Sequence, residues 1–180
     1  MTNTDTSDTF ISEYATAPRA KSGTKSWLML CVFVVGALTA GSVGSLFTGA
    51  ELDGWYREIA KPAFTPPDWV FPIAWTYLFV TMGIAAWLVW RAPFTGPEKT
   101  FALRAYWAHF IVNVGWSAAF FWLTSPALGS VVAAVLFGAV TWVALLFARI
   151  RPLAGVLFVP YALWVAFATL LTVTIWFMNA

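Results

Sequence analysis

Charged residues are scarce in this chain. Asp, Glu, Lys and Arg make up 10% of its 180 residues, and it contains one histidine and one cysteine. A single cysteine cannot close a disulfide within the chain, and one histidine with one cysteine cannot complete a zinc site. Soluble domains carry about a quarter charged residues, whereas 61% of this chain is hydrophobic. The composition therefore indicates an integral membrane protein and argues against conventional metal catalysis.

The long apolar runs contain no Asp, Glu, Lys or Arg. Each is about 20 residues long, which is the length of a helix that crosses a bilayer. None alternates every second residue, as a barrel strand would. The runs cover residues 27–47, 69–90, 105–123, 128–148 and 153–177. They predict an all-α fold, an integral membrane bundle of five transmembrane helices that forms one domain over residues 27–180.

Residues 1–26 are instead rich in Thr, Ser and small polar side chains. Such a segment cannot bury a core, so we expect a disordered polar amino-terminal tail. The early acidic residues Asp5, Asp8 and Glu13 argue against a mitochondrial transit peptide. A secretory signal is harder to dismiss, because basic residues precede an apolar run that reaches small residues at 36–42. Since that run continues to spanning length, we interpret it as the first helix.

The basic residues predict the orientation, because Lys and Arg accumulate in cytoplasmic loops. Eight of the ten lie on one side of the predicted bundle, and only Arg57 and Lys61 lie on the other. The eight are Arg19, Lys21, Lys25, Arg91, Lys99, Arg104, Arg149 and Arg151. We therefore expect a multi-pass protein with its amino terminus inside and its carboxyl terminus outside. A bacterial cell membrane is the expected location, and an outer or organellar membrane stays open.

The lack of acidic residues in the apolar runs disfavours two mechanisms. Proton-coupled carriers bury carboxylates or bases inside the bilayer, and a Ser-His-acid triad needs an acid. His109 is the one ionisable candidate of this kind, with Cys31 as the sole thiol. His109 has two open interpretations: it ligates haem iron or senses pH, or it makes an interhelical hydrogen bond.

Aromatic and polar residues recur at spacings of three and four on three of the predicted helices. Each set therefore shares one helix face. The sets are Tyr106, His109, Asn113, Trp116 and Phe120; Trp75, Phe79 and Met82; and Tyr161, Trp164, Ala168 and Thr172. Together they could enclose an apolar pocket with a few oriented polar groups. The alternative is a bundle core held by aromatic packing and interhelical hydrogen bonds.

Three motifs carry a family resemblance. The stretch WYREIAKPAFTPPDWVFPIAW at Trp55–Trp75 resembles the loop that leads into helix two of the TspO/MBR family, the tryptophan-rich sensory and translocator proteins, also called peripheral-type benzodiazepine receptors. HFIVNVGWSAAFF at His109–Phe121 and AGVLFVPYALWVAFATLLT at Ala154–Thr172 resemble its motifs in helices three and five. The motifs agree in order and spacing, and the resemblance covers the whole chain after the tail.

The resemblance implies a five-helix bundle, commonly a homodimer, with a pocket below the first long loop. In the family this pocket binds porphyrins and other tetrapyrroles, sterols in some members, and synthetic ligands. The implied ligand-binding residues are Trp55, Phe64, Trp75, Asn113, Trp116, Trp164, Ala168 and His109. The implied lid residues are Lys61, Pro62, Pro66, Pro67 and Trp69. The prolines should hold the loop extended, and its tryptophans could equally anchor at the membrane interface.

Several positions depart from the family pattern. Phe64 stands where many members have Trp, His109 where most have Gln, and Thr172 where most have Asn. The end of the last helix carries no basic residue, so we do not expect sterol recognition through that segment. Gly36, Ala40 and Gly44 form a small-residue stripe for close helix packing, and Gly115 with Ala119 could pack between protomers.

We therefore expect a membrane receptor or sensor that binds porphyrins or similar hydrophobic ligands and regulates or transports them. Two alternatives stay open: an enzyme that degrades bound porphyrin, whose catalytic residues the sequence does not name, and a scaffold without ligand. No obligatory cofactor and no metal site are expected, and porphyrin or haem would be a ligand. The expected partners are the lipid bilayer, the hydrophobic ligand and a second copy of the chain, with no nucleic acid.

Overall fold

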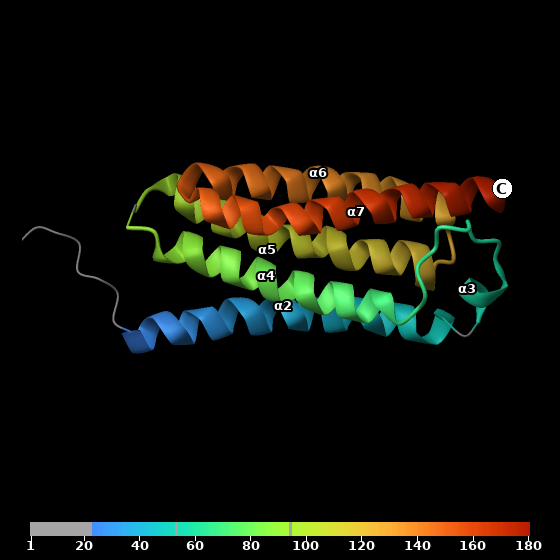
Figure 1. Cartoon of the computed structure of the whole chain (residues 1–180), viewed down its shortest axis with the longest axis horizontal. Helices are drawn as coiled ribbons and strands as arrows, with labels where there is room; N and C mark the ends of the chain where they lie inside the picture. The colour runs from blue at the N-terminus through green and yellow to red at the C-terminus, as the bar shows by residue number, and fades with distance from the viewer. Residues whose placement is uncertain (1–22, 53, 94) are drawn as a thin grey trace, which may run out of the picture.

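The computed structural model describes residues 23–52, 54–93 and 95–180, and its elements in these ranges are all helical (Figure 1). This confirms the prediction of an all-α protein. In chain order the elements are α2 (Gly23–Leu52), α3 (Trp55–Glu58), α4 (Val70–Arg91), α5 (Pro97–Ser117), the π-helix η1 (Ala118–Trp122), α6 (Pro126–Ile150) and α7 (Pro152–Met178).

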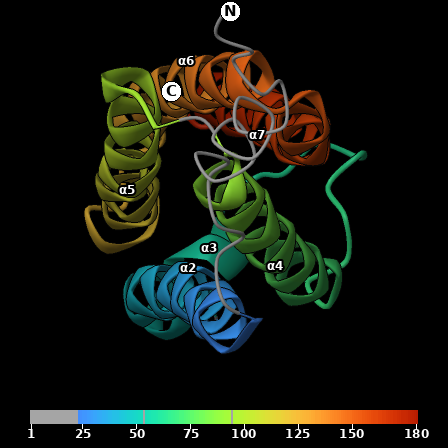
Figure 2. The same ribbon diagram turned by 90° about the vertical axis from the view of Figure 1, so that its left-hand side faces the viewer.

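The long helices form a closed ring. The order around the ring is α2, α4, α7, α6, α5 and back to α2, each helix packing against the next. An end-on view shows α4 between α2 and α7, with α5 on the opposite side (Figure 2). Because α3 and the end of α7 lie at the same end of the bundle, the loop after α3 can close over that end (Figure 1).

Four of these helices, α2, α4, α6 and α7, are long and apolar enough to cross a membrane. This confirms an integral membrane protein. The predicted fifth span, residues 105–123, is divided between α5 and η1. Arg104, His109 and Asn113 make α5 more polar than the other long helices, so its membrane crossing is not established by length and composition.

The helices are longer than the apolar runs that predicted them. α2 already begins at Gly23, so residues 23–26 of the predicted tail are helical, and residues 1–22 lie outside the described ranges. α5 begins at Pro97 instead of residue 105. Its first turn is anchored by Lys99, whose buried ammonium donates a 2.7 Å hydrogen bond to the Ala92 carbonyl after α4. The apolar stem and the hydrogen bond of Lys99 therefore allow α5 to begin before residue 105, in a segment that the search for apolar runs had left out because it is charged.

The π-helix turns the chain at the end of α5. Its wider turn is visible in the 2.9 Å hydrogen bond from the Leu123 amide to the Ala118 carbonyl, five residues back. Thr124 then adopts a positive φ of 45°, and the Ser125 hydroxyl caps α6 by accepting from the Leu128 amide. A π-turn shifts the helical register, so side chains after it face directions that a 3.6-residue period does not predict.

A backbone contact sets the distance between α2 and α4. A Cβ atom built on Gly83 of α4 would lie 2.6 Å from the Val34 Cα of α2. Farther along the same seam, a Cβ on Gly41 would lie 2.2 Å from the Phe79 ring. Small residues let helices in a membrane approach closely, because lipid provides no hydrophobic drive between them. The expected small-residue stripe of α2 packs within the bundle at Gly36, against Trp107, and at Gly44, where a Cβ would lie 3.3 Å from the Ser117 hydroxyl oxygen.

The loop between α3 and α4 is fastened to the carboxyl terminus. The Asn179 side chain accepts from the Ala60 amide at 3.0 Å and donates to the Ala60 carbonyl at 2.9 Å. The same side-chain nitrogen also donates to the Ile175 carbonyl in α7. Farther along the loop, Phe64 packs edge-on against Phe167 of α7, at 6.4 Å between ring centroids. We call this set of contacts the terminal clasp.

We expect Gly83→Ala to lower the stability of the bundle by about 1–3 kcal/mol, because the new methyl group forces α4 away from the Val34 backbone. Gly138→Ala is the matched control, since a Cβ there meets nothing within 4 Å. That substitution should be neutral or stabilise by up to about 1 kcal/mol through helix propensity. Thermal unfolding in detergent measures both, and equal effects at the two glycines would contradict the close contact.

We expect Asn179→Ala to free the loop at Ala60. Losing two hydrogen bonds costs about 1–2 kcal/mol of local stability, so the Ala60 amide should exchange its hydrogen about five- to thirtyfold faster. Met178→Ala removes a neighbouring exposed side chain and should leave this rate unchanged. Hydrogen exchange followed by mass spectrometry measures it, and an unchanged rate in Asn179→Ala would contradict the terminal clasp.

Candidate ligand-binding site

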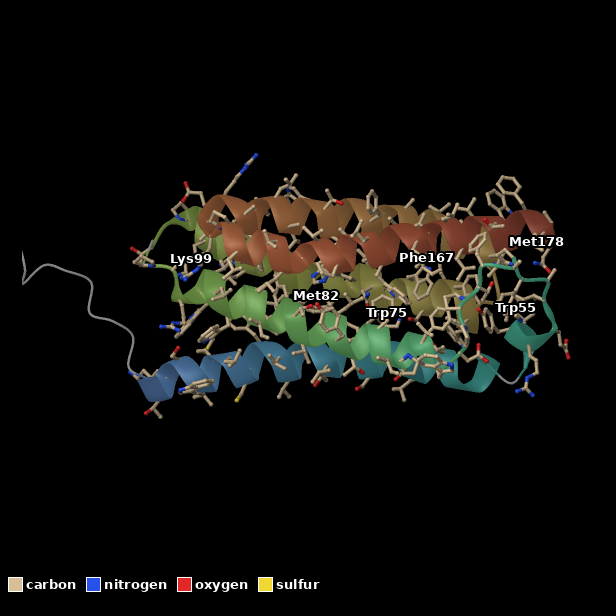
Figure 3. All side chains as sticks on the ribbon, in the orientation of Figure 1. Trp55, Trp75, Met82, Lys99, Phe167 and Met178 are labelled. Carbon is tan, nitrogen blue, oxygen red and sulfur yellow. The ribbon has the colours of Figure 1, made fainter. Side chains whose placement is uncertain are left out.

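A cavity of about 440 Å³ lies at the α3 end of the bundle, below the loop that the terminal clasp holds. Its walls come from α2, α3, α4, α5, η1 and α7. Figure 3 shows Trp55, Trp75 and Phe167 gathered toward this end, with Lys99 at the other. The volume falls within the range of sites for drug-sized ligands, which is about 300–1,000 Å³.

Apart from Leu38, the wall from α2 is made of Gly, Ser and Thr, whose small side-chain volume leaves the space open. Its hydroxyl groups are bonded to carbonyls of their own helix: Ser42 to Leu38 at 2.9 Å, Ser45 to Ser42 at 2.7 Å and Thr48 to Gly44 at 3.3 Å. Because these donors are satisfied, the wall can face an apolar ligand. Ser42 and Ser45 of α2, and Pro72 and Thr76 of α4, line the cavity and are also exposed. The cavity is therefore open sideways between α2 and α4.

Aromatic rings form the opposite walls, and Trp75 is at their centre. Its ring stacks on Phe79 at 5.5 Å between centroids and lies 6.2 Å from Trp116. Trp116 in turn stacks on Phe120 at 6.0 Å, with 12° between the ring planes. All four rings line the cavity. Offset and edge contacts of this kind hold the rings in fixed orientations, so their free faces form a rigid, flat-sided space.

Few polar groups reach this space. The Asn113 side chain lines the cavity, and its nitrogen donates a 2.9 Å hydrogen bond to the Tyr161 hydroxyl, which fixes the amide plane. The Trp116 indole nitrogen is buried without a hydrogen-bond partner among the described residues. A buried donor without a partner costs free energy, so it is a candidate to donate to a ligand.

The loop end of the cavity carries Tyr56 and Asp68. Burial, and to a smaller extent the negative charge of Asp68, raise the pKa of the Tyr56 hydroxyl to about 12. Tyr56 therefore keeps its proton at neutral pH. The Lys61 ammonium lies 4.6 Å from the centre of the Tyr56 ring and donates to the Tyr56 carbonyl. This lysine fastens the loop from outside, and its side chain does not line the cavity.

Half of the predicted ligand-binding residues line the cavity: Trp75, Asn113, Trp116 and Ala168. Two others lie behind its walls: Trp55 packs edge-on against Phe120 at 5.6 Å, and Trp164 against Trp75 at 6.4 Å. Phe64 is 47% exposed and packs against Phe167, which does not line the cavity.

His109 is separate from the cavity. Its ring is buried beside Phe110, at 4.2 Å between centroids, and its Nδ1 contacts the Tyr106 carbonyl of its own helix. Nε2 has no partner among the described residues. The three helix faces that were predicted to enclose a pocket do so only in their halves nearer α3, which line the cavity. In the other halves, Tyr106, Met82 and Tyr161 belong to the buried core.

None of the predicted lid residues Lys61, Pro62, Pro66, Pro67 and Trp69 lines the cavity. They shape the loop around it instead: Pro62 is buried, and its carbonyl accepts from the Thr65 amide and hydroxyl. Trp69 is 66% exposed at the start of α4, a position consistent with an interface anchor.

Sequence reasoning missed several lining residues, among them Tyr56, Asp68, Phe71 and Phe121. Phe121 escaped because the π-helix brings two consecutive phenylalanines to the cavity. The α2 wall was interpretable only as a packing stripe, although the cluster of Gly and Ser between 41 and 49 is its signal. Within the described ranges no three His, Cys, Asp or Glu side chains gather as metal ligands.

Comparison with known proteins gives consistent matches over nearly the whole described chain. The TspO/MBR family model matches residues 31–177. The tryptophan-rich protein TspO of Chlorobaculum tepidum is 37% identical over 152 residues, which cover 84% of this chain and 95% of that protein. Protein CrtK of Rhodobacter capsulatus is 34% identical, covering 86% and 94%. The human translocator protein is 30% identical, covering 83% and 89%. The chain therefore belongs to the TspO/MBR family.

Proposed function

We propose that this protein is a membrane receptor that binds a porphyrin or a similar flat, hydrophobic molecule in the cavity at the α3 end. The observation that supports the proposal most directly is the aromatic wall of Trp75, Phe79, Trp116 and Phe120 around a space of about 440 Å³. A flat π-system gains both buried area and ring contacts against such a wall.

The polar groups support a bound, oriented ligand. The unpartnered Trp116 nitrogen offers one donor, and the Asn113 amide, fixed by Tyr161, offers its oxygen. In a pocket with mostly apolar walls, a few polar groups are enough to fix the orientation of the ligand. The sideways opening between α2 and α4 gives a ligand dissolved in the bilayer a direct route to the cavity.

We also propose that α5 crosses the membrane as the fifth span, with the amino terminus inside. Its position in the ring between α2 and α6 supports this, because both neighbours are apolar enough to span. The carboxyl ends of α4 and α6 carry Arg91, Arg149 and Arg151. These two ends lie at the end of the bundle opposite α3 (Figure 1). The positive-inside rule then places α3 and the carboxyl terminus outside.

A second copy of the chain is the partner that we propose, through the outer face of α5. A Cβ on Gly115 would meet nothing within 4 Å, and Ile111 is 76% exposed, so this face is open for close packing. Ala119, the other residue expected there, is buried within the bundle and is not available.

The ligand proposal is tested by titrating the purified protein with protoporphyrin IX, followed by the absorbance of the porphyrin. We expect saturable binding that Trp75→Leu weakens at least about tenfold, or about 1.4 kcal/mol, because the central ring of the wall is lost. Trp142→Leu is the matched control, since Trp142 lies on the outer side of α6 and is 49% exposed.

Equal affinity of both variants and the unchanged protein would show that the dye only dissolves in the micelle, and would contradict the proposal. Recovery of the porphyrin with an unchanged spectrum separates binding from degradation. Asn113 is not a suitable target for this test, because its hydrogen bond to Tyr161 also supports the core.

The orientation is tested with single cysteines after Cys31→Ala has removed the native thiol. Ala63→Cys lies on the exposed loop after α3, and Thr95→Cys on the exposed loop between α4 and α5. A membrane-impermeant maleimide should label Ala63→Cys in intact cells, and Thr95→Cys only after the cells are opened. The reverse pattern would contradict the proposed orientation.

A further inference from the structure

A second hollow lies at the end of the bundle opposite α3. It is a groove of about 580 Å³ between the start of α5 and the end of α6, two helices that pack against each other (Figure 2). We call it the α5–α6 groove. The side chains that line it are Pro97, Glu98, Phe101, Leu146, Arg149 and Ile150. None of these six lines the cavity at the α3 end, so the groove is a separate candidate site.

The groove contains two opposite charges. Glu98 and Arg149 both line it and are exposed, so water reaches both. Within the described part of the chain, the two side chains do not pair with each other or with another residue. Each has a role at its own helix end, because an acid in the first turn of α5 and a base in the last turn of α6 interact favourably with the helix dipoles. That role leaves their hydrogen-bonding atoms available to a ligand.

The other cations at this end of the bundle lie outside the groove. The Lys99 ammonium donates to the Ala92 carbonyl, and the side chains of Arg104 and Arg151 are exposed but do not line the groove. Together these cations make this end positive, which attracts the phosphate of any phospholipid. Glu98 is therefore the lining group that can distinguish one headgroup from another.

The apolar residues give the groove a direction. Phe101 lies four residues after Pro97, so it is about 6 Å farther from the end of α5. Leu146 lies four residues before Ile150, and thus about 6 Å from the end of α6. Because α6 is long and apolar enough to cross a membrane, this direction leads into the bilayer. Charged groups at the surface with apolar side chains below them match the two parts of a phospholipid.

We propose that the α5–α6 groove binds a phospholipid whose headgroup carries both a phosphate and a protonated amine, with an acyl chain along Phe101 and Leu146. The Arg149 guanidinium would donate to the phosphate, which suits its planar set of donors. The Glu98 carboxylate would accept from the ammonium. Both charges of the groove would then be paired by one molecule.

The same pair of charges disfavours the other common headgroups. An anionic headgroup without an amine brings a phosphate close to Glu98 and supplies no cation in return. A choline headgroup carries a positive charge but has no N–H to donate to the carboxylate. The inference goes beyond the proposed receptor function and does not depend on the ligand of the cavity. It requires that the end of α6 lie at the membrane surface, which holds in either orientation of the chain.

The experiment is native mass spectrometry of the full chain, released from detergent that contains equal amounts of three phospholipids with identical acyl chains. The three are phosphatidylethanolamine, phosphatidylcholine and phosphatidylglycerol. We expect the first bound lipid to be the ethanolamine lipid, about three- to fivefold over each of the others. In Glu98→Gln the ratio of ethanolamine to glycerol lipid should fall about three- to fivefold, because the partner of the amine is lost. In Arg149→Gln the total bound lipid should fall by a similar factor.

Four further variants control for folding and for general charge. Glu98→Asp and Arg149→Lys keep the charges and should keep the order of preference. Arg151→Gln removes an exposed base close to the groove, and Glu58→Gln removes an exposed acid of α3. Neither residue lines the groove, so each substitution should change the lipid ratio less than about twofold. Thermal unfolding in lipid-free detergent measures the helix-dipole contribution separately.

Each contrary result overturns the lipid proposal in a different way. If the lipid ratio is the same in Glu98→Gln as in the unchanged protein, Glu98 acts only on its helix. If Arg151→Gln or Glu58→Gln shifts the ratio as much, the effect is one of net charge. If the groove variants change the amount of dimer in the same spectra, the groove is a contact between two copies. If the unchanged protein retains no lipid, the groove is not a lipid site, and the porphyrin titration still decides the receptor proposal.

Discussion

The cavity depends on the distance between α2 and α4, and that distance is set where the Val34 backbone meets Gly83. With the two helices in contact there, the small residues that follow on α2 leave a gap that the rings of α4 and α5 do not fill. Interiors of proteins are otherwise closely packed, so a space of this size needs a structural cause. Here it is the absence of side-chain volume along one helix, opposite a rigid aromatic wall.

The aromatic residues have two roles in this arrangement. Phe158, Tyr106 and Phe147 fill the half of the bundle away from α3 and are almost completely buried. Toward α3, the same residue types leave one ring face free, since no large side chain of α2 covers them. The core and the pocket therefore use the same kinds of aromatic ring. They differ in the side chains opposite the rings, which are large in the core and small in the pocket.

Much of the fold could be predicted from the sequence, since apolar runs without charge identify the four helices that are long and apolar enough to span a membrane, and the later part of α5. The start of α5 could not be predicted, because its anchoring lysine is buried through a hydrogen bond to the carbonyl of Ala92, which follows the end of α4. For the site, helical spacing placed Trp75, Asn113, Trp116 and Ala168 on faces that could enclose a pocket, and all four line the cavity. The spacing could not tell which end of each face was hollow. Phe121 lines the cavity because of the π-turn, and Asp68 because of the path of the loop before α4. Neither feature produces a periodic pattern in the sequence.

The terminal clasp has a consequence for how the protein is made. Asn179 follows α7 in the chain, so the loop over the cavity cannot be fastened at Ala60 until α7 has been synthesised and has entered the bundle. Helices α2, α4 and α5 are synthesised before α7, so most of the residues that line the cavity precede the residue that fastens the loop. The loop over the pocket is thus fastened by a residue that lies 119 positions later in the chain, and its closure has to wait for the assembly of the helices between them.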